Sequence, residues 1–257
     1  MTTMETPRCA PRLSIVLATY QAAGTLQRCL QSISAQTSRD WELIVIDGGS
    51  TDGTVGIIQT HAEHIAYWHS RPDAGIYDAW NQALAHARGE YVCFLGADDA
   101  FHSPETLSDV FSAIGDASYD LVTCRGNLVG ASAASTLLVG TSWADAKLPR
   151  RIRLCHPGLL HHRALFERHG SFDSGFRIAA DFDFLLRLPR DIACLDLPLV
   201  TVDIQDGGIS RRQFWQRIGE YRRIHAASPR VGAIKAWLYW ADKAWRRPIA
   251  LLLGLPH

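Results

Sequence analysis

The chain has 257 residues, of which 47% are hydrophobic and 20% charged, a composition that excludes a disordered chain. Lysine and arginine number 26, as do aspartate and glutamate, so no overall field attracts nucleic acid and no nucleic-acid partner is expected. The length suits one large α/β domain with a C-terminal appendage.

The six cysteines lie far apart, with no Cys-x-x-Cys pair and no zinc-ligand spacing. Reduced and mostly buried thiols are therefore expected, as in a cytoplasmic protein. Residues 1–12 lack the apolar core of a signal peptide. The longest late apolar run, Ile249 to Leu255, is too short to span a bilayer.

Strands and helices alternate along the first half of the chain. The apolar run from Leu13 to Ala18 predicts a buried strand, and apolar residues then recur at helical spacing over 26–33. The alternation continues to about residue 125 and predicts a parallel sheet covered on both faces. The other elements expected there are strands at 42–46, 65–69 and 91–95, a helix from 55, a helix at 77–87 ending at Gly89, and a helix with Ser103 as N-cap and Pro104 as first residue.

The second half is less regular. Residues 127–140 are small, polar and glycine-containing, which is typical of an irregular hairpin. Short helices are expected at 164–170 and 181–188, an extended stretch at 192–204 and helix at 211–247.

Asp98 and Asp99 immediately follow the buried strand that ends at Leu95. Adjacent carboxylates at a strand end repel each other and lose solvation, so they require a cation or hydrogen-bond donors. Mg²⁺ or Mn²⁺ would satisfy them and keep coordination positions open for phosphate oxygens. The alternative is a turn in which Asp99 caps the next element, although Ser103 offers a better cap.

Asp47 is another acid at a strand end, and the following Gly48 and Gly49 let the backbone approach a ligand closely. Ligands of parallel sheets gather at the carboxyl ends of strands, where such an acid can accept hydrogen bonds from a base or ribose. A simple Asp-Gly-Gly turn is the alternative. No Gly-x-Gly-x-x-Gly or Walker sequence supports a redox cofactor or a P-loop.

Four segments in order resemble family 2 glycosyltransferases with the GT-A fold: Ser14–Tyr20, Glu42–Gly53, Arg71–Asn81 and Gly89–Asp99. The resemblance is strongest to a subgroup similar to bacterial colanic acid and mycobacterial phenolic-glycolipid glycosyltransferases. It implies a Rossmann-like, mostly parallel central sheet flanked by helices, with a C-terminal helical appendage. It also implies an N-terminal extension at 1–11, a catalytic domain at 12–210 with a nucleotide-binding half at about 12–125 and an acceptor-binding half at about 126–210, and a basic, aromatic helical segment at 211–257.

The resemblance further assigns residues to the donor. Thr19 and Tyr20 fall where such enzymes contact the nucleotide base, and Asp47 falls where they bind base or ribose. Arg71 and Asp73 match the edge of the nucleotide pocket.

The metal site is implied in the same way. Asp98 and Asp99 match the family's Asp-x-Asp region, where the first contacts ribose or metal and the last coordinates the metal, Mg²⁺ or Mn²⁺, that bridges the diphosphate. The usual acid two positions before Asp98 is Gly96 here.

The segment from Arg177 to Arg187 resembles the Glu-Asp helix start at which these enzymes carry their general base. The aligned Glu is Ala180, whereas the Asp is retained as Asp181. An inverting transferase needs a carboxylate to take the proton of the acceptor hydroxyl as it attacks the anomeric carbon. Asp181 is assigned that role, with a helix N-cap as the alternative, and Asp183 faces away.

His156 falls where the subgroup has a His-Gln pair lining the acceptor side. Gly208 and Ser210 match a flexible Gly-Gly-x-Ser segment of the subgroup and are expected in a lid that closes on the donor. His161 and His162 are adjacent and lack second-ligand spacing, so surface or structural roles are expected for them.

The C-terminal segment is basic and aromatic. Such a helix can lie on an anionic membrane surface, which suits a lipid-linked acceptor. The alternative is that its tryptophans pack on the catalytic domain or form a dimer contact. The residues concerned are Trp237, Trp240, Trp245, Lys235, Lys243, Arg246 and Arg247.

These patterns and the resemblance predict a cytoplasmic hexosyltransferase, peripheral at the inner face of the membrane. It would move a sugar from a UDP-, GDP- or dTDP-sugar to a glycan or lipid-linked acceptor in polysaccharide or glycolipid biosynthesis. A nucleotidyltransferase acting on sugar phosphates would release pyrophosphate and would not need Asp181. A non-catalytic sugar-nucleotide-binding protein of the same fold is the other alternative.

Overall fold

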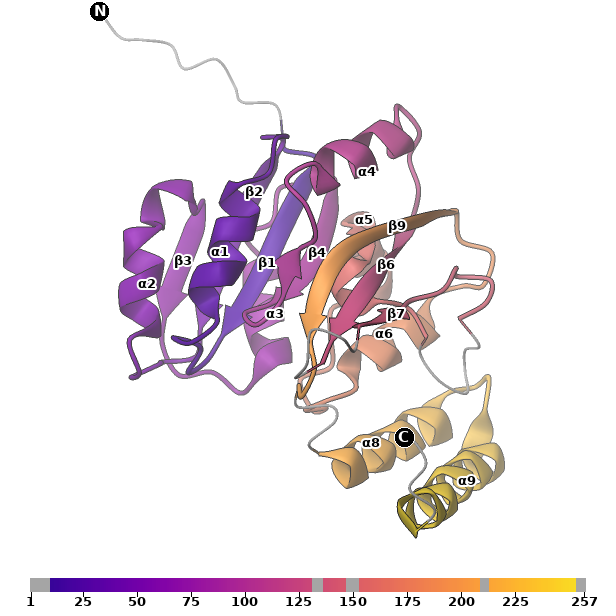
Figure 1. Ribbon diagram of the computed structural model, residues 1–257. Helices are drawn as coiled ribbons and strands as arrows, with labels where there is room; N and C mark the ends of the chain where they lie inside the picture. The colour runs from indigo at the N-terminus through magenta and orange to yellow at the C-terminus, as the bar shows by residue number, and fades with distance from the viewer. Residues whose placement is uncertain (1–9, 131–135, 147–152, 209–212, 253–257) are drawn as a thin grey trace, which may run out of the picture.

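The computed structural model describes residues 10–130, 136–146, 153–208 and 213–252. One sheet forms its centre (Figure 1), with the strand order β3-β2-β1-β4-β8-β6-β9-β5 and with β7 paired to β6. The strands are β1 (Leu13–Thr19), β2 (Trp41–Asp47), β3 (Tyr67–Ser70), β4 (Tyr91–Gly96), β5 (Ala100–Phe101), β6 (Leu121–Val129), β7 (Thr136–Val139), β8 (Leu160–His162) and β9 (Cys194–Gln205).

Helices cover both faces of this sheet. Apolar residues of α1, α2 and α4 form one core with the sheet, and those of α3, α5 and α6 form the other. Two short 3-10 helices lie at Ala62–His64 and His156–Gly158. The helices are α1 (Leu26–Ser34), α2 (Thr54–Thr60), α3 (Ile76–Leu84), α4 (Thr106–Ile114), α5 (Ala164–His169), α6 (Ala180–Arg187), α8 (Phe214–Ala227) and α9 (Gly232–Leu252).

The alternation of side chains along β1 shows how the two cores arise. Leu13, Ile15 and Leu17 are fully buried in the core on the α1 side, whereas Val16 is buried in the core on the α3 side. Successive side chains of a strand point to opposite faces, so a strand buried on both faces is apolar at most positions. The predicted parallel α/β arrangement is confirmed for β1 to β4, which pair in parallel.

The sheet continues beyond β4 in a way that the alternation did not predict. β8 lies between β4 and β6 and is antiparallel to both. It has three residues, and each neighbour pairs with it at two positions. A strand that short has no periodicity to detect. The expected hairpin at 127–140 is confirmed in β6 and β7, which pair antiparallel from Gly126 to Val139.

Two predicted helix boundaries were wrong, the end of α3 and the start of α4. α3 ends at Leu84 rather than at Gly89. Gly89 is needed for close packing, because a Cβ there would lie 2.5 Å from the backbone nitrogen of Ser14. α4 begins at Thr106 with Glu105 as N-cap, and the Ser103 hydroxyl instead accepts a hydrogen bond from the Glu105 amide at 3.2 Å.

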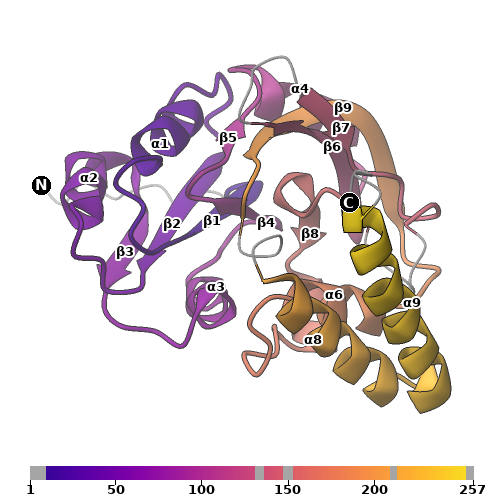
Figure 2. The same ribbon diagram turned by 60° about the horizontal axis from the view of Figure 1, so that its bottom comes forward.

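The expected C-terminal helix is two helices, α8 and α9, that pack side by side (Figure 2). Pro229 lies in the connection, and Gly232 begins α9 with a φ of +76°. Ile218 and Ile224 of α8 are buried. No helix of the described residues is long and apolar enough to cross a membrane. The cysteines of the described residues are free thiols, four of them buried.

Candidate active site

Strands β1, β2 and β4 end at the same edge of the sheet. Thr19 pairs with Asp47, and Ala18 pairs with Gly96. The carboxyl ends of the three strands are therefore aligned, and the loops that follow them begin side by side. The loops after the three strands therefore enclose a common crevice, as expected for the carboxyl edge of a parallel sheet.

Asp47 is fully buried and shapes one of these loops. Its carboxylate accepts hydrogen bonds from the hydroxyls of Thr19 at 2.8 Å, Ser50 at 2.6 Å and Ser70 at 2.6 Å. It also accepts from the amides of Gly49 at 3.1 Å and Ser50 at 2.8 Å. Burial raises the pKa of Asp47, but these donors outweigh it and lower the pKa overall. The carboxylate thus holds the loop and does not reach the cleft beside it.

That cleft has a volume of about 700 Å³. Thr19, Tyr20 and Asp73, all predicted donor residues, line it together. Gly48 keeps it open, because a Cβ there would lie 3.0 Å from an oxygen of Asp73. Arg177, from the second half of the chain, also lines the cleft and was not predicted. The remaining lining residues are Ala18, Gly48, Gly49, Pro72, Ala74, Gly75, Ile76 and Ala79.

Asp73 and Arg71 diverge although they are close in sequence. Asp73 is half-buried, and its Oδ1 accepts the amide of Gly75 at 2.8 Å. Burial raises its pKa, and the charges of Asp78 and Asp47 raise it further. The Arg71 guanidinium instead donates to Gln82 of α3 at 3.3 Å and does not line the cleft.

Asp98 and Asp99 converge above Gly96. A Cβ at Gly96 would lie 2.9 Å from Oδ1 of Asp98 and 2.6 Å from Oδ2 of Asp99, so both oxygens point into the space that glycine leaves. Asp99 is 5% exposed, and its Oδ1 accepts the amide of Gln205 at 3.2 Å. Burial, and then the charge of Asp98, raise the pKa of Asp99 to about 7.

This donor set fits a divalent cation. Two converging oxygens that repel each other are stabilised when a cation lies between them. The described residues contain no group of three or more His, Cys, Asp and Glu side chains that could hold a metal by themselves. Mg²⁺ takes one or two carboxylates and completes its shell with phosphate oxygens and water, which suits this pair. Asp99 lies in a turn, with its amide donating to the carbonyl of Gly96 at 3.0 Å, but it does not cap a helix, since Glu105 is the N-cap of α4.

Asp181 is the second residue of α6, whose N-cap is Ala179, so it is not a helix cap. Its Oδ1 accepts a hydrogen bond from the hydroxyl of Tyr77 at 3.0 Å. Tyr77 is buried in α3, and burial followed by the charge of Asp181 raises its pKa far above the ordinary value. The phenol therefore stays protonated and donates, which leaves Oδ2 of Asp181 for another partner.

Glu220 of α8 holds the residues that precede Asp181. It is buried, and its carboxylate accepts the backbone amides of Arg177 at 3.1 Å, Ile178 at 2.9 Å and Ala179 at 3.0 Å. These amides have no partner within α6, because they lie at or before its first turn. Helix α8 thus fixes the start of α6, the helix that carries Asp181.

Comparison with known proteins identifies this architecture. The model of "Glycosyl transferase family 2" matches residues 14–154, more than half of the chain. The chain belongs to glycosyl transferase family 2.

Relatives and solved structures agree with this family. The glycosyltransferase is 35% identical over 182 residues to a "PGL/p-HBAD biosynthesis glycosyltransferase" of Mycobacterium bovis, covering 69% of this chain and 70% of the relative. It is 31% identical over 232 residues to an uncharacterized glycosyltransferase of Mycobacterium tuberculosis, covering 84% and 83%. The predicted family, subgroup and enzyme class are confirmed.

Two solved structures share the fold. TarS of S. aureus, residues 1–349 in complex with UDP-GlcNAc, has a TM-score of 0.66 and 17% identity over 90% of this chain and 71% of that chain. A mannosyltransferase from Pyrobaculum calidifontis in complex with GDP-Man and Mn²⁺ has a TM-score of 0.63 and 23% identity over 96% and 80%. The predicted GT-A fold is confirmed.

His156 of the glycosyltransferase lies on aromatic rings. Its ring stacks on Trp80 at 5.3 Å with an interplanar angle of 14°, and it lies 5.9 Å from Phe94. Burial lowers its pKa, while the charge of Asp181 opposes that shift. Its Nε2 is buried without a hydrogen-bond partner among the described residues. His161, in β8, is fully buried, in keeping with the structural role expected for it.

The predicted lid falls at the edge of the described chain. Gly208 is half-buried and would accommodate a Cβ without contact. Ser210 lies outside the described residues.

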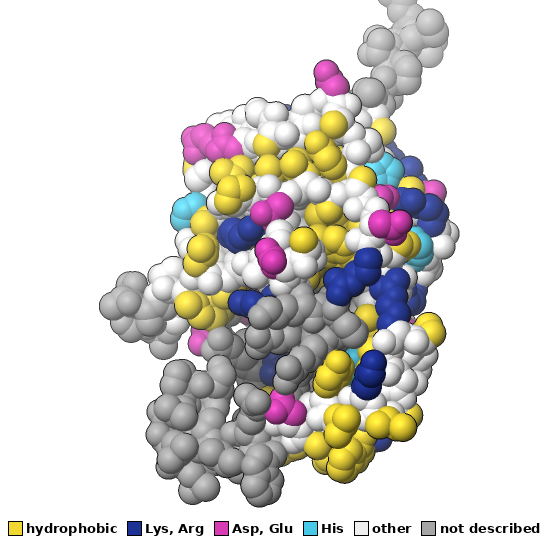
Figure 3. Space-filling view, turned by 90° about the vertical axis from the view of Figure 1, so that its right-hand side faces the viewer, with side chains coloured by type: hydrophobic (Ala, Val, Ile, Leu, Met, Phe, Trp, Pro, Cys, Tyr) yellow, Lys and Arg dark blue, Asp and Glu magenta, His cyan; other side chains and the backbone are white. Residues whose placement is uncertain are grey.

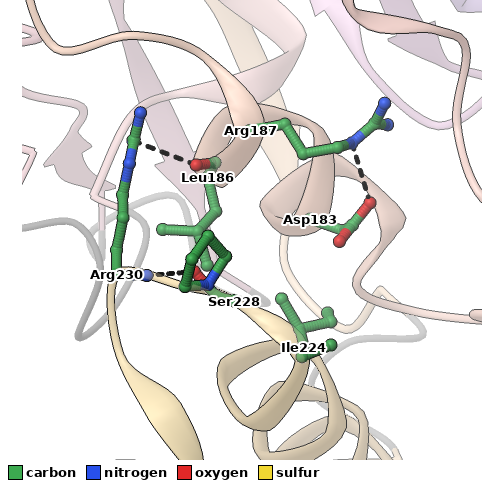
Figure 4. Close-up of a pocket in the computed structure, with 8 residues that line it drawn as sticks. Asp183, Leu186, Arg187, Ile224, Ser228 and Arg230 are labelled. Atoms are coloured by element: carbon green, nitrogen blue, oxygen red, sulfur yellow. Dashed lines mark hydrogen bonds and ion pairs between the residues drawn. The ribbon is translucent and has the colours of Figure 1, made fainter.

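A second cavity of about 350 Å³ lies where α6 meets the connection between α8 and α9 (Figure 4). None of the predicted site residues lines it. Asp183 pairs there with Arg187 at 3.1 Å, and Arg230 donates to the carbonyl of Leu186 at 3.0 Å. The position of Asp183 in this cavity agrees with the expectation that it faces away from Asp181.

Two residues that support the site were missed by sequence reasoning. Tyr77 begins the helix expected at 77–87, directly after the residues assigned to the edge of the nucleotide pocket, and nothing in its local sequence indicates a contact with Asp181. Glu220 carried a detectable signal, because it lies four residues before Ile224 on the buried side of α8, where an acid requires a partner.

Proposed function

We propose that this glycosyltransferase transfers a sugar with inversion from a nucleotide-sugar to a glycan or lipid-linked acceptor, and that it requires Mg²⁺ or Mn²⁺. The observation that carries the proposal is the convergence of Asp98 and Asp99 over Gly96 at the sheet edge that also opens the donor cleft. This arrangement supports a site for a diphosphate-bound cation at the same sheet edge as a site for a nucleoside.

The cleft suits the nucleoside. The ring of Tyr20 is 67% exposed and offers a flat surface on which a base can stack. Asp73 is a carboxylate at the same cleft that can accept an N–H of uracil, thymine or guanine. The structural neighbours bind UDP-GlcNAc and GDP-Man, which supports a UDP-, GDP- or dTDP-sugar as donor.

The diphosphate requires positive charge as it leaves. Asp98 and Asp99 would hold the Mg²⁺ or Mn²⁺, which when bound neutralises the developing charge on the diphosphate. Arg177 lines the cleft and is exposed, so its guanidinium can donate to phosphate oxygens.

Asp181 takes the proton in this scheme. The acceptor oxygen forms a bond to the anomeric carbon, the bond from that carbon to the diphosphate oxygen breaks, and the hydroxyl proton passes to Oδ2 of Asp181. Tyr77 occupies Oδ1 and fixes the carboxylate orientation. A base on the side of the sugar opposite the leaving group gives inversion.

The names of the relatives support a class of acceptor. The mycobacterial relative is named for glycolipid biosynthesis, which supports a lipid-linked or glycan acceptor in glycolipid or cell-surface polysaccharide synthesis. An enzyme using cytoplasmic nucleotide-sugars and such an acceptor would work at the inner face of the membrane as a peripheral protein.

Thermal unfolding with a panel of UDP-, GDP- and dTDP-sugars, each with Mg²⁺, Mn²⁺ or chelator, tests the donor and metal. One donor should raise the melting temperature only with metal, and Asp99→Asn should abolish that effect. Asp181→Asn should keep the donor-dependent rise but lose transfer. Release of pyrophosphate during turnover, or protection by no sugar nucleotide, would contradict the proposal.

A further inference from the structure

Helix α9 presents an apolar stripe to solvent. Ile234, Trp237 and Leu238 are 81%, 57% and 53% exposed, and their spacing of three and four residues places them on one side of the helix. Another side of α9 packs on α8, where the rings of Tyr239 and His225 lie 5.3 Å apart. The helix therefore has an inner apolar side used by the fold and an outer one that no described residue covers.

The segment that carries this stripe is rich in positive charge. Residues 214–252 include eight lysines and arginines and two acids, although the whole chain has no net charge. One of those acids, Glu220, is buried and bound to backbone amides. Lys235 and Arg222 are exposed. Figure 3 shows hydrophobic side chains gathered at the lower end of the molecule, with Lys and Arg side chains above them.

We propose that the α9 stripe, formed by Ile234, Trp237 and Leu238, rests on the surface of an anionic lipid bilayer. This inference rests on the proposed use of a lipid-linked acceptor, which would be held at such a surface. A tryptophan ring suits the headgroup boundary, and basic side chains are attracted to anionic lipids. The contact is peripheral, since none of the helices described could span a bilayer.

A bilayer fits this surface better than a second copy of the chain does. Two copies that met through their stripes would bring two strongly basic segments together, which costs free energy through like-charge repulsion. An anionic surface removes that repulsion and also covers the three apolar side chains. The charge around the stripe therefore favours lipid as its occupant.

The stripe belongs to the same pair of helices as Glu220. α9 packs on α8, and Glu220 of α8 binds the amides directly before the helix of Asp181. A bilayer under α9 would thus lie beside the acceptor side of the enzyme. A lipid-linked hydroxyl could approach Asp181 while its lipid stayed in the membrane.

Sedimentation with lipid vesicles tests the proposal on the full-length chain. The wild type should bind vesicles of phosphatidylcholine and phosphatidylglycerol about tenfold more strongly than vesicles of phosphatidylcholine alone. The combined change Ile234→Ser, Trp237→Ser and Leu238→Ser should weaken that binding about tenfold or more. The matched control changes Leu137→Ser and Leu138→Ser, both 60% exposed on β7, and should stay within about twofold of wild type.

A charge variant separates lipid binding from a folding defect. Arg222→Glu with Lys235→Glu keeps the stripe and should lose the preference for anionic vesicles. Equal vesicle binding by wild type and stripe variant would overturn the proposal, as would a wild-type dimer that the stripe variant dissociates. Donor-dependent thermal protection, measured on the same samples, should be unchanged in both variants, and its absence from wild type would count against the proposed transferase instead.

Discussion

At the scale of single residues, the hydrogen bond between Tyr77 and Asp181 occupies one oxygen of the proposed general base and leaves the other for the acceptor. Tyr77→Phe removes the 3.0 Å bond without changing ring packing. We expect kcat to fall about 10- to 100-fold with little change in the KM for donor, because orientation of the base is lost while the cleft is intact. Steady-state kinetics of Tyr77→Phe and wild type measure kcat and KM separately.

The control distinguishes a positioning role from a general effect of losing a hydroxyl. Tyr77→Phe should have no further effect in an Asp181→Asn background, since both changes act on one proton transfer. Tyr67→Phe removes a hydroxyl that contacts His69 at 3.3 Å and should leave kcat unchanged. Additive losses in the double variant would show that Tyr77 acts elsewhere.

Gly96 is a second residue whose small size carries a prediction. Gly96→Ala places a methyl group 2.6 Å from Oδ2 of Asp99, so the two carboxylates must separate. Metal-dependent protection by the donor should therefore be lost, as measured by thermal unfolding. Gly56→Ala, in α2 with open space around its Cβ, is the matched control and should raise stability by about 0.5 kcal/mol without affecting donor binding.

At the scale of elements, α8 supports α6 through Glu220. Glu220→Ala leaves three backbone amides of the loop before α6 without their acceptor. We expect the free energy of unfolding to fall by about 3 kcal/mol and kcat to fall with it, as urea unfolding and kinetics would show. Glu167→Ala removes an exposed ion pair with Arg163 and should change stability by less than about 0.5 kcal/mol. Equal effects of the two changes would contradict the support role.

At the scale of the whole molecule, the buried histidine in β8 gives stability a pH dependence. Burial, and next the charge of His156, hold the pKa of His161 well below its ordinary value of 6.5. The unfolded chain therefore binds a proton below pH 6.5 that the folded chain does not, so stability is present above that pH and falls as pH decreases. The slope for one proton is at most about 1.4 kcal/mol per pH unit.

Replacement of His161 tests this dependence. His161→Phe fits a cluster in which the rings of Phe94 and Phe166 each lie 5.6 Å away, and it should flatten the stability curve between pH 6.5 and 5. Urea unfolding at several pH values measures it. His102→Gln, at an exposed side chain, should leave the slope unchanged. If the His161 variant kept the same dependence of unfolding free energy on pH, other titratable groups would be its source.

Local patterns were enough to predict the parallel strands β1 to β4 of this fold. Continuous apolar runs such as Leu13 to Ala18 mark strands buried on both faces, and the acids after these strands must lie at one edge. β8 could not be predicted, because its pairing with β4 and β6 depends on neighbours far away in the chain. For the same reason the bond from Tyr77 to Asp181, which spans 104 residues, leaves no trace in local sequence.

The contact made by Glu220 also orders events during synthesis of the chain. Strands β1 to β4 and the loops of the donor cleft leave the ribosome first, followed by Asp181. Glu220 is 42 residues beyond Ile178, whose amide it binds. At about 5–20 residues per second, the nascent protein spends several seconds with the strands of the cleft already translated and α6 unanchored. The segment that carries Asp181, the proposed proton acceptor, is therefore fixed late, when the hairpin of α8 and α9 emerges and docks.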